Sequence, residues 1–405
     1  MRLPIWATVL MAVGTLTAAC GSVGPQTGRP VSTPTGAASP LPPGKGSPPP
    51  PGQPIGGATL WVSDLSWVSN QEGWAIGTAN SCSATFTTCT AVLHTADGGV
   101  QWTQLGTIAT PPGQVLNQIK FANAEVGYAF VANGQSAAYM TLNGGDGWQL
   151  TPGPPVADLK VVGGNVVAVR FDHSGCPGPC AWSIDAAPIG STQWRTLTDP
   201  PDNRVNHGSA VLVTQGPDAI YAAFPSNPAQ GIVRPDSQLL ISDNGGATWS
   251  QIGSPCRQGG TAHGLTIAVA TAPGQVLAVL CLESPSQLAV YVRVSTDGGL
   301  TFGPPRSVPG NGDFSQLALT SSSSLFVGNA VTGGSGAYGY HLMGSFNGGL
   351  NWRTLASQTA DLPGPLATPS DFLGFEDPTH GRWIGGGSSL WTTSDGGRGW
   401  SESAF

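Results

Sequence analysis

Ser242-Asp243-Asn244-Gly245-Gly246-Ala247-Thr248-Trp249 decides the fold, because five similar stretches recur along the chain. All six read hydroxyl, any residue, Asp or Asn, Gly, Gly, two further residues and an aromatic. The other five are 95–102 (TADGGVQW), 141–148 (TLNGGDGW), 295–302 (STDGGLTF), 345–352 (SFNGGLNW) and 393–400 (TSDGGRGW). Each stretch is called a box below, and its positions are numbered one to eight.

The closing aromatics divide the chain into units of similar length. They lie at positions 102, 148, 194, 249, 302, 352 and 400, so that successive intervals run from 46 to 55 residues. The unit that ends at Trp194 has lost the turn, since Ile189 stands where Asp or Asn is expected. A period of this size is typical of stacked blades or solenoid turns rather than of one irregular core.

Each unit contains four short segments that are typical of β-strands. In the first unit these are 65–69, 73–77, 91–95 and 102–105. The second segment recurs at 127–131, 165–169, 219–223, 275–279, 324–328 and 381–385. These runs are rich in β-branched and aromatic residues, and no helical period competes with them. The sequence therefore predicts an all-β, seven-bladed β-propeller of four-stranded antiparallel blades with 58–62 as a candidate edge strand.

The N-terminus reads as a bacterial lipoprotein signal. Residues 1–20 combine Arg2, an apolar run too short for a comfortable membrane span, and Leu16-Thr17-Ala18-Ala19-Cys20, which resembles a lipobox. Cys20 is then the predicted lipid attachment site, although Thr17 stands where Leu is more usual. An ordinary cleaved signal with an incidental cysteine is the alternative.

Composition separates a linker from the predicted propeller. Residues 21–57 hold 11 Pro and 9 Gly, which predicts a disordered linker, and 58–405 form the propeller. The first 57 residues contain three bases and no acid, which leaves 12 bases, 22 acids and a net charge of −10 in the body. Such a body is expected to bind no nucleic acid and to reach the membrane only through its lipid anchor.

The six remaining cysteines form three pairs that are close in sequence. These pairs are Cys82 with Cys89, Cys176 with Cys180, and Cys256 with Cys281. Export would permit disulfides, and proximity favours this connectivity among fifteen. A zinc site is the competing interpretation of the Cys176 pair, but no further cysteine or histidine pair completes four ligands.

The boxes resemble the Asp-box repeats of sialidases, sortilin-type receptor propellers and photosystem II stability/assembly factor-like propellers. The last group fits best, because a Gly-Trp-Ala-x-Gly-like second strand at 73–77 accompanies the box. The box acids and amides are interpreted as structural turn residues, because such side chains accept hydrogen bonds from backbone N–H groups. They are Asp97, Asn143, Asn244, Asp297, Asn347 and Asp395. A calcium site is the alternative, but each box offers one such side chain where calcium needs several oxygens.

The resemblance places the boxes opposite the face on which propeller enzymes usually bind substrate. The candidate ligand face is therefore assigned to loops between second and third strands and between blades. Its residues are Arg204, His207, Arg234, Asp236, Arg257 and His263. No catalytic residue, metal ligand or cofactor is assigned.

A sialidase-like glycoside hydrolase is the alternative function. That family would require three arginines, a tyrosine nucleophile with a glutamate partner, and an aspartate acid/base. The early Arg-Ile-Pro motif is absent, and no arginine occurs between Arg29 and Arg170. The sequence favours a monomeric, non-catalytic binding or scaffolding propeller, lipid-anchored outside the cytoplasm or secreted. Its expected partner is a protein or a cell-envelope glycan.

Overall fold

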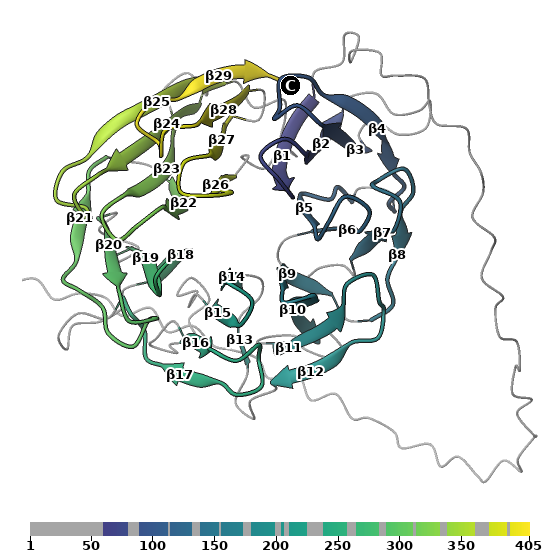
Figure 1. The fold of residues 1–405 in the computed structure, drawn as a ribbon, viewed down its shortest axis with the longest axis horizontal. Coiled ribbons are helices and arrows are strands. Elements are labelled where there is room, and N and C mark those ends of the chain that lie inside the picture. The colour runs from purple at the N-terminus through teal and green to yellow at the C-terminus, as the bar shows by residue number, and fades with distance from the viewer. Residues whose placement is uncertain are drawn as a thin grey trace, which may run out of the picture. The chain divides into compact units, whose positions relative to one another are not determined.

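The computed structural model contains seven β-sheets arranged as a propeller, which confirms the predicted fold class (Figure 1). It describes residues 60–79, 89–111, 114–131, 138–153, 155–172, 180–198, 204–205, 210–224, 238–256, 265–282, 289–310, 313–332, 338–360, 372–386 and 389–405. Each sheet is one blade, built from four antiparallel strands that are consecutive in sequence, and the sheet of blade three has a short fifth strand. No helix long and apolar enough to cross a membrane occurs in these ranges.

The strands follow the order of the chain from the centre of the ring outward. Blade one contains β1 (Leu60–Trp67), β2 (Gly73–Ala79), β3 (Cys89–Thr95) and β4 (Thr103–Ile108). Blade two contains β5 (Gln118–Phe121), β6 (Gly127–Phe130), β7 (Tyr139–Thr141) and β8 (Gln149–Leu150). Blade three contains β9 (Val156–Val162), β10 (Asn165–Asp172), β11 (Cys180–Pro188) and β12 (Arg195–Thr198), and the short β13 (Arg204–Val205) pairs with β11.

The remaining four blades repeat the plan. Blade four contains β14 (Val211–Gln215), β15 (Ala219–Phe224), β16 (Gln238–Ser242) and β17 (Ser250–Ile252). Blade five contains β18 (Leu265–Ala272), β19 (Val276–Leu282), β20 (Val290–Ser295) and β21 (Arg306–Val308). Blade six contains β22 (Asp313–Leu319), β23 (Leu325–Thr332), β24 (Tyr338–Ser345) and β25 (Arg353–Ala360). Blade seven contains β26 (Leu373–Phe375), β27 (Gly381–Gly385), β28 (Ser389–Thr393) and β29 (Ser401–Ala404).

The predicted second strands all coincide with observed ones, whereas the start of the propeller needs a correction. The candidate edge strand at 58–62 is wrong, because Leu60–Val62 opens β1, the innermost strand of blade one. Blade seven is complete without it, since β26 to β29 already supply four strands. The side chains of Leu60–Val62 are also buried, because an inner strand has both faces covered and buries more apolar surface than an edge strand.

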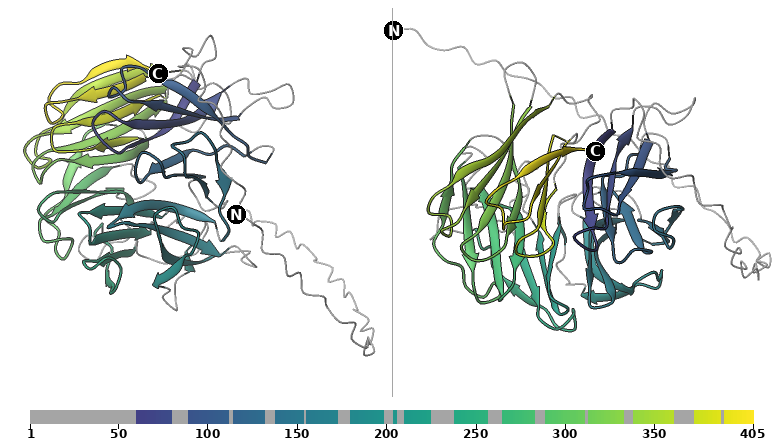
Figure 2. Two further views of the ribbon diagram at one scale, coloured as in Figure 1. Left: turned by 45° about the vertical axis from the view of Figure 1, so that its right-hand side comes forward. Right: turned by 45° about the horizontal axis from the view of Figure 1, so that its top comes forward.

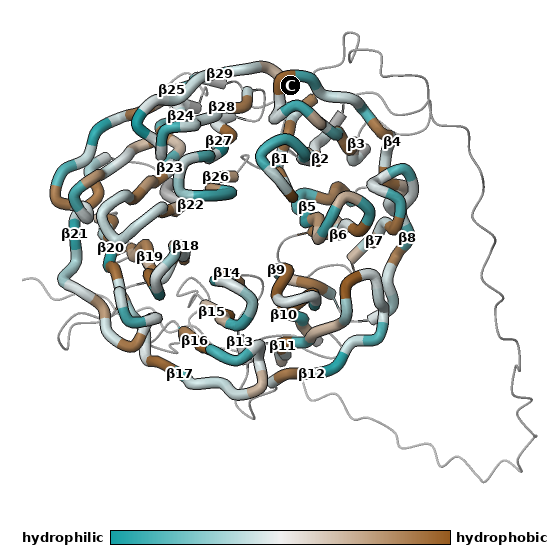
Figure 3. The backbone as a smooth tube through the Cα atoms, in the orientation of Figure 1, coloured by the Kyte–Doolittle hydropathy of each residue, from teal (hydrophilic) through white to brown (hydrophobic). Residues whose placement is uncertain are grey.

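The hydrophobic core lies between the blades rather than at the centre of the ring. The described buried apolar residues form seven clusters, and each cluster draws its members from two neighbouring blades. Figure 2 shows the blades standing face to face, and Figure 3 shows apolar segments along the strands. Blades seven and one share such a cluster, in which Ile384 and Leu390 pack with Leu65 and Leu93. The ring therefore closes by side-chain packing and not by exchange of a strand.

The boxes form the turns between third and fourth strands, and their hydrogen bonds repeat six times. The hydroxyl at position one donates to the Asp or Asn Oδ1 at position three over 2.7–3.1 Å. That oxygen accepts the backbone N–H of position seven at 2.9–3.0 Å. Both glycines of each box have positive φ, from 67° to 105°, a backbone conformation that glycine adopts readily.

Each box is also fastened to the turn between the first two strands of its blade. The N–H of the fourth-position glycine donates to a carbonyl there at 2.8–2.9 Å in all six boxes, as in Gly245 to Asp218 and Gly298 to Gln275. Because strands alternate in direction, these two kinds of turn lie on the same face of the ring, called the box face below.

Blade three has no box, but a similar backbone hydrogen bond joins its turn between third and fourth strands to its turn between first and second strands. The N–H of Ile189 donates to the Gly164 carbonyl at 3.2 Å, which replaces the bond of the missing turn. The Arg170 guanidinium lies 4.7 Å from the centroid of the Trp194 ring, and Arg170 is buried against Asp185. A cation–π contact thus holds the closing aromatic of this blade.

Candidate functional site

In several blades, one position of the second strand reaches toward the turn between the third and fourth strands of the next blade. This residue is the cross-strand partner of the third-strand residue that directly precedes box position one, as Trp74 is of His94. In blade one Trp74 Nε1 donates to the Gly144 carbonyl at 2.8 Å, and in blade two the hydroxyl of Tyr128 accepts the Gly190 N–H at 2.9 Å. These contacts seal the joints between blades one, two and three on the box face.

The joint between blades four and five is not sealed in this way. Its bridging residue is Tyr221, whose hydroxyl donates to Gln215 Oε1 at 3.4 Å rather than bonding to the next box. A cavity of about 880 Å³ opens here, and it is called the box-face groove. Its size is within the range of ligand pockets, roughly 300–1,000 Å³.

Two turns and two boxes form the walls of the box-face groove. The turns are Gly216-Pro217-Asp218 and Pro273-Gly274-Gln275, and the box residues include Asp243, Thr248, Asp297 and Leu300. The floor is fixed by the first strands, because Thr271 Oγ1 donates to the Thr214 carbonyl at 2.9 Å and Gln215 Nε2 donates to the Ala272 carbonyl. The groove therefore lies at the joint between blades four and five, and Phe375 of blade seven also lines it.

The electrostatics of the groove are acidic. Asp218, Asp243 and Asp297 line it, and no Lys, Arg or His stands among its described lining residues. Hydrogen bonds from Ser295 and Thr301 lower the pKa of Asp297 to about 2, so this carboxylate is ionised at neutral pH. Burial raises the pKa of Tyr221, and the charge of Asp243 adds to this effect.

Asp297 of the groove is unsuited to serve as the general acid of a glycosidase. A glycosidase needs one carboxyl group with a raised pKa as general acid, and the pKa of Asp297 moves in the opposite direction. The tyrosines whose side chains the structure describes are buried in strands; they are Tyr128, Tyr139, Tyr221, Tyr291 and Tyr340. Within the described ranges, no group of three or more His, Cys, Asp or Glu side chains could hold a metal ion.

A second cavity of about 450 Å³ lies on the box face at the joint between blades seven and one. Here the bridging residue is Arg382, which donates to the Asn70 carbonyl at 3.1 Å and lies 4.2 Å from the Trp67 ring centroid. Asp377 accepts hydrogen bonds from Asn70 Nδ2 at 3.0 Å and pairs with His380 at 2.8 Å. These polar contacts join the first and last blades, and we interpret this joint as structural.

Glu376 makes this joint sensitive to pH. Burial raises its pKa to about 7, against the opposing effect of the Arg382 guanidinium 3.8 Å away. Between about pH 4.5 and 7 the unfolded chain loses the proton that the folded state keeps, so the stability associated with this group falls as pH rises. We expect the free energy of unfolding to drop by roughly 2 kcal/mol more in the wild type than in Glu376→Gln between pH 5 and 8.

Urea unfolding at the two pH values measures this difference. Asp377 does not contribute in that window, because hydrogen bonds from Thr379 hold its pKa well below the usual range. Equal pH dependence in the wild type and Glu376→Gln would refute the assignment.

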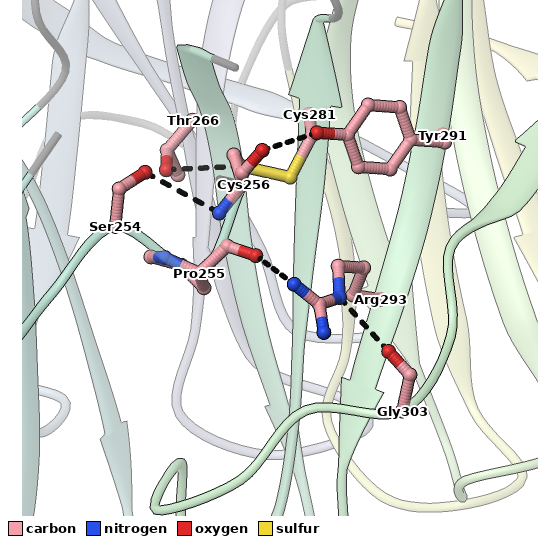
Figure 4. The surroundings of a disulfide bond; sticks show 8 residues. All are labelled: Ser254, Pro255, Cys256, Thr266, Cys281, Tyr291, Arg293 and Gly303. Atoms are coloured by element: carbon pink, nitrogen blue, oxygen red, sulfur yellow. Dashed lines mark hydrogen bonds between the residues drawn. A yellow bond between two sulfur atoms is a disulfide. The ribbon is translucent and has the colours of Figure 1, made fainter. Parts of the chain in front are cut away.

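A disulfide joins Cys256, just after blade four, to Cys281 in β19 (Figure 4). Both cysteines are fully buried, with a sulfur–sulfur distance of 1.96 Å. The segment is held further by Arg293, whose Nη1 donates to the Pro255 carbonyl at 2.7 Å and whose Nε donates to the Gly303 carbonyl at 2.8 Å. The connection between blades four and five is thus covalently fixed to blade five, at the end of β19 that lies away from the box face.

Removing this disulfide is expected to destabilise the propeller. The cysteines are separated by 25 residues, so the loss of loop constraint in the unfolded chain amounts to about 3 kcal/mol. Chemical unfolding of Cys256→Ala/Cys281→Ala against the wild type measures this loss. Reduction of the wild type serves as the control and should match the variant; a difference below about 1 kcal/mol would count against a formed disulfide.

Three of the other predicted site residues lie in described strands. Arg204 lies in β13, where its backbone pairs with Ala181, rather than in a loop. Cys89 opens β3 and Cys180 opens β11. The remaining predictions lie outside the described residues: Cys20, Cys82, Cys176, His207, Arg234, Asp236, Arg257 and His263. Both cavities described above lie on the box face, opposite the loops to which the ligand face was assigned.

Sequence reasoning named Asp297 only as a turn residue and missed the other carboxylates of the box-face groove. Asp243 carried a signal, because it occupies box position two, where the other boxes have Ala96, Leu142, Thr296, Phe346 and Ser394. A residue that the turn does not require at that position is free to serve another purpose. Asp218 and Tyr221 carried no comparable signal, since one is in a short turn and the other in a buried strand.

No family model matches the chain, and no curated protein matches it. Similar solved structures include YCF48 bound to a D1 peptide, with a TM-score of 0.53 and 16% identity over 83% of this chain and 94% of that one. A PL25 ulvan lyase has a TM-score of 0.53 and 8% identity over 88% and 95% of the two chains. Acylaminoacyl peptidase from Pyrococcus horikoshii has a TM-score of 0.50 and 7% identity over 85% and 52%. Likeness at these identities shows a common fold and leaves function open.

Proposed function

We propose that this chain is a non-catalytic binding propeller that holds a segment of a protein partner in the box-face groove, outside the cytoplasm. The observation that carries the proposal is the groove itself, an 880 Å³ cavity fixed between two blades and lined by carboxylates, backbone turns and the exposed Leu300. Such a cavity offers contact area and charge, while its described residues offer no paired nucleophile and base.

The sequence supports the location and the class of protein in this proposal. The lipobox-like 16–20 and the Pro/Gly-rich 21–57 favour a lipid-anchored body carried on a linker, and the boxes favour the assembly-factor-like branch of Asp-box propellers. The similar structure with a bound D1 peptide supports a protein partner, because it shows that a chain with this fold can hold a peptide. Intact mass of the mature protein tests the anchor, and an unmodified Cys20 would end that part of the proposal.

The function is tested by comparing catalysis with binding on one preparation. The full-length chain in detergent is expected to leave fluorogenic sialosides and other glycosides intact, and to be retained on native envelope fractions. Pretreating the fractions with protease should abolish retention if the partner is a protein. Glycoside turnover would favour the sialidase-like alternative, and retention that survives protease treatment would favour a glycan.

A further inference from the structure

The carboxylates of the box-face groove differ in what already binds them. Asp297 Oδ1 accepts hydrogen bonds from Ser295 at 2.7 Å and from the Thr301 N–H at 2.9 Å, and its Oδ2 accepts the Thr301 hydroxyl at 2.5 Å. Asp297 is therefore occupied in holding its own turn. It still contributes a fixed negative charge to the groove wall.

Asp218 and Asp243 have exposed side chains, and the turns do not use them. Asp218 takes part in the blade only through its backbone carbonyl, which accepts the Gly245 N–H at 2.8 Å. Asp243 occupies the variable second position of its box, so the hydrogen bonds of the turn form without it. Both carboxylates line the same cavity and are open to a ligand.

The groove also has apolar wall residues next to these charges. Pro217, Pro273 and Ile241 line it, and Leu300 is 69% exposed at its edge. A long cationic side chain fits this arrangement, because its methylene stem can cover apolar surface while its charged end meets the carboxylates. With no positive side chain among the described lining residues, an incoming cation meets no competing charge within the groove.

We infer that the groove binds an extended protein segment through Lys or Arg side chains, which Asp218 and Asp243 receive. This inference rests on the proposed function and names the chemistry of its partner. The cavity of about 880 Å³ is larger than one such side chain needs, so it has room for flanking backbone, and the turns at its walls offer peptide groups for hydrogen bonds.

The probe is a fluorescently labelled peptide of Gly, Ala and Ser that carries two arginines separated by one residue. The control peptide has glutamates at those two positions. Fluorescence polarisation with the full-length chain should show binding of the arginine peptide alone. Asp218→Asn/Asp243→Asn should weaken it by about fivefold or more, as should raising salt from roughly 20 mM to about 300 mM. Asp146→Asn is the matched control, because Asp146 is exposed in the box of blade two and does not line the groove.

The outcomes of these experiments distinguish a failure of this inference from a failure of the proposed function. If the arginine peptide fails to bind, or binds the double variant as well as it binds wild type, the inference is wrong. If the double variant is also retained on envelope fractions as the wild type is, the binding function stands and its basis lies elsewhere. An equal affinity for free arginine methyl ester would replace the peptide with a small cation and overturn the assignment of a protein segment.

Discussion

Replacing Asp64 with alanine is expected to lower the free energy of unfolding by about 3–5 kcal/mol, because it leaves a largely buried cation without its partner. Asp64 is 2% exposed in the innermost strand of blade one, and it accepts Lys120 Nζ at 2.6 Å and the Ile119 N–H at 2.8 Å from blade two. Burial lowers the pKa of Lys120, and Asp64 opposes that shift. Without Asp64, both the ammonium group and the backbone N–H lose their acceptor.

Urea unfolding measures this loss, and two further variants test its cause. Asp64→Leu combined with Lys120→Met should recover much of the stability, since the buried charge is removed together with its partner. Asp146→Ala, at an exposed box position, should change the free energy by less than about 0.5 kcal/mol. If Asp64→Ala stays within about 1 kcal/mol of wild type, the ion pair does not hold the first two blades together.

Gly397→Ala is expected to destabilise by roughly 3–5 kcal/mol, because strain and overpacking act at one residue. Gly397 occupies box position five of blade seven with a φ of 82°, and an added Cβ would approach the ring of the buried Phe326 of blade six. The ring has no room to retreat, since it also packs against Phe375 and Trp400.

Gly245→Ala is the matched control for this prediction. Gly245 has a similar φ of 67°, but its added Cβ meets nothing within 4 Å. It should therefore lose only about 1–2 kcal/mol, the cost of the left-handed backbone. Thermal and urea unfolding of both variants separate backbone strain from overpacking against Phe326. Equal losses of unfolding free energy would show that the box glycines are needed for backbone conformation alone.

The architecture was predictable because its signals are local. A box such as 242–249 specifies its own turn through a hydroxyl, an Asp or Asn and two glycines, and its recurrence counts the blades. The second strands followed from short runs such as 73–77 for the same reason. The box acids were interpreted as turn residues, and their hydrogen bonds to the neighbouring backbone agree with that interpretation.

The groove was not predictable, because it arises where two blades meet. Asp218 and Asp297 are almost eighty residues apart in sequence, and only ring closure of the blade joints brings their turns together. The same holds for Arg382 and Asn70, which lie in the last and first blades. Ring geometry also decides that Tyr221 leaves its joint open while Trp74 closes its own.

The central claim is that the box-face groove is where the partner binds, and one pair of variants tests it most directly. Leu300→Trp places a bulky side chain at box position six in the groove, and Leu350→Trp places the same side chain at the equivalent exposed position of the next blade, outside the groove. The measurement is retention of each full-length chain on native envelope fractions. We expect Leu300→Trp to lose retention and Leu350→Trp to match wild type. Undiminished retention of a folded Leu300→Trp variant would contradict the account.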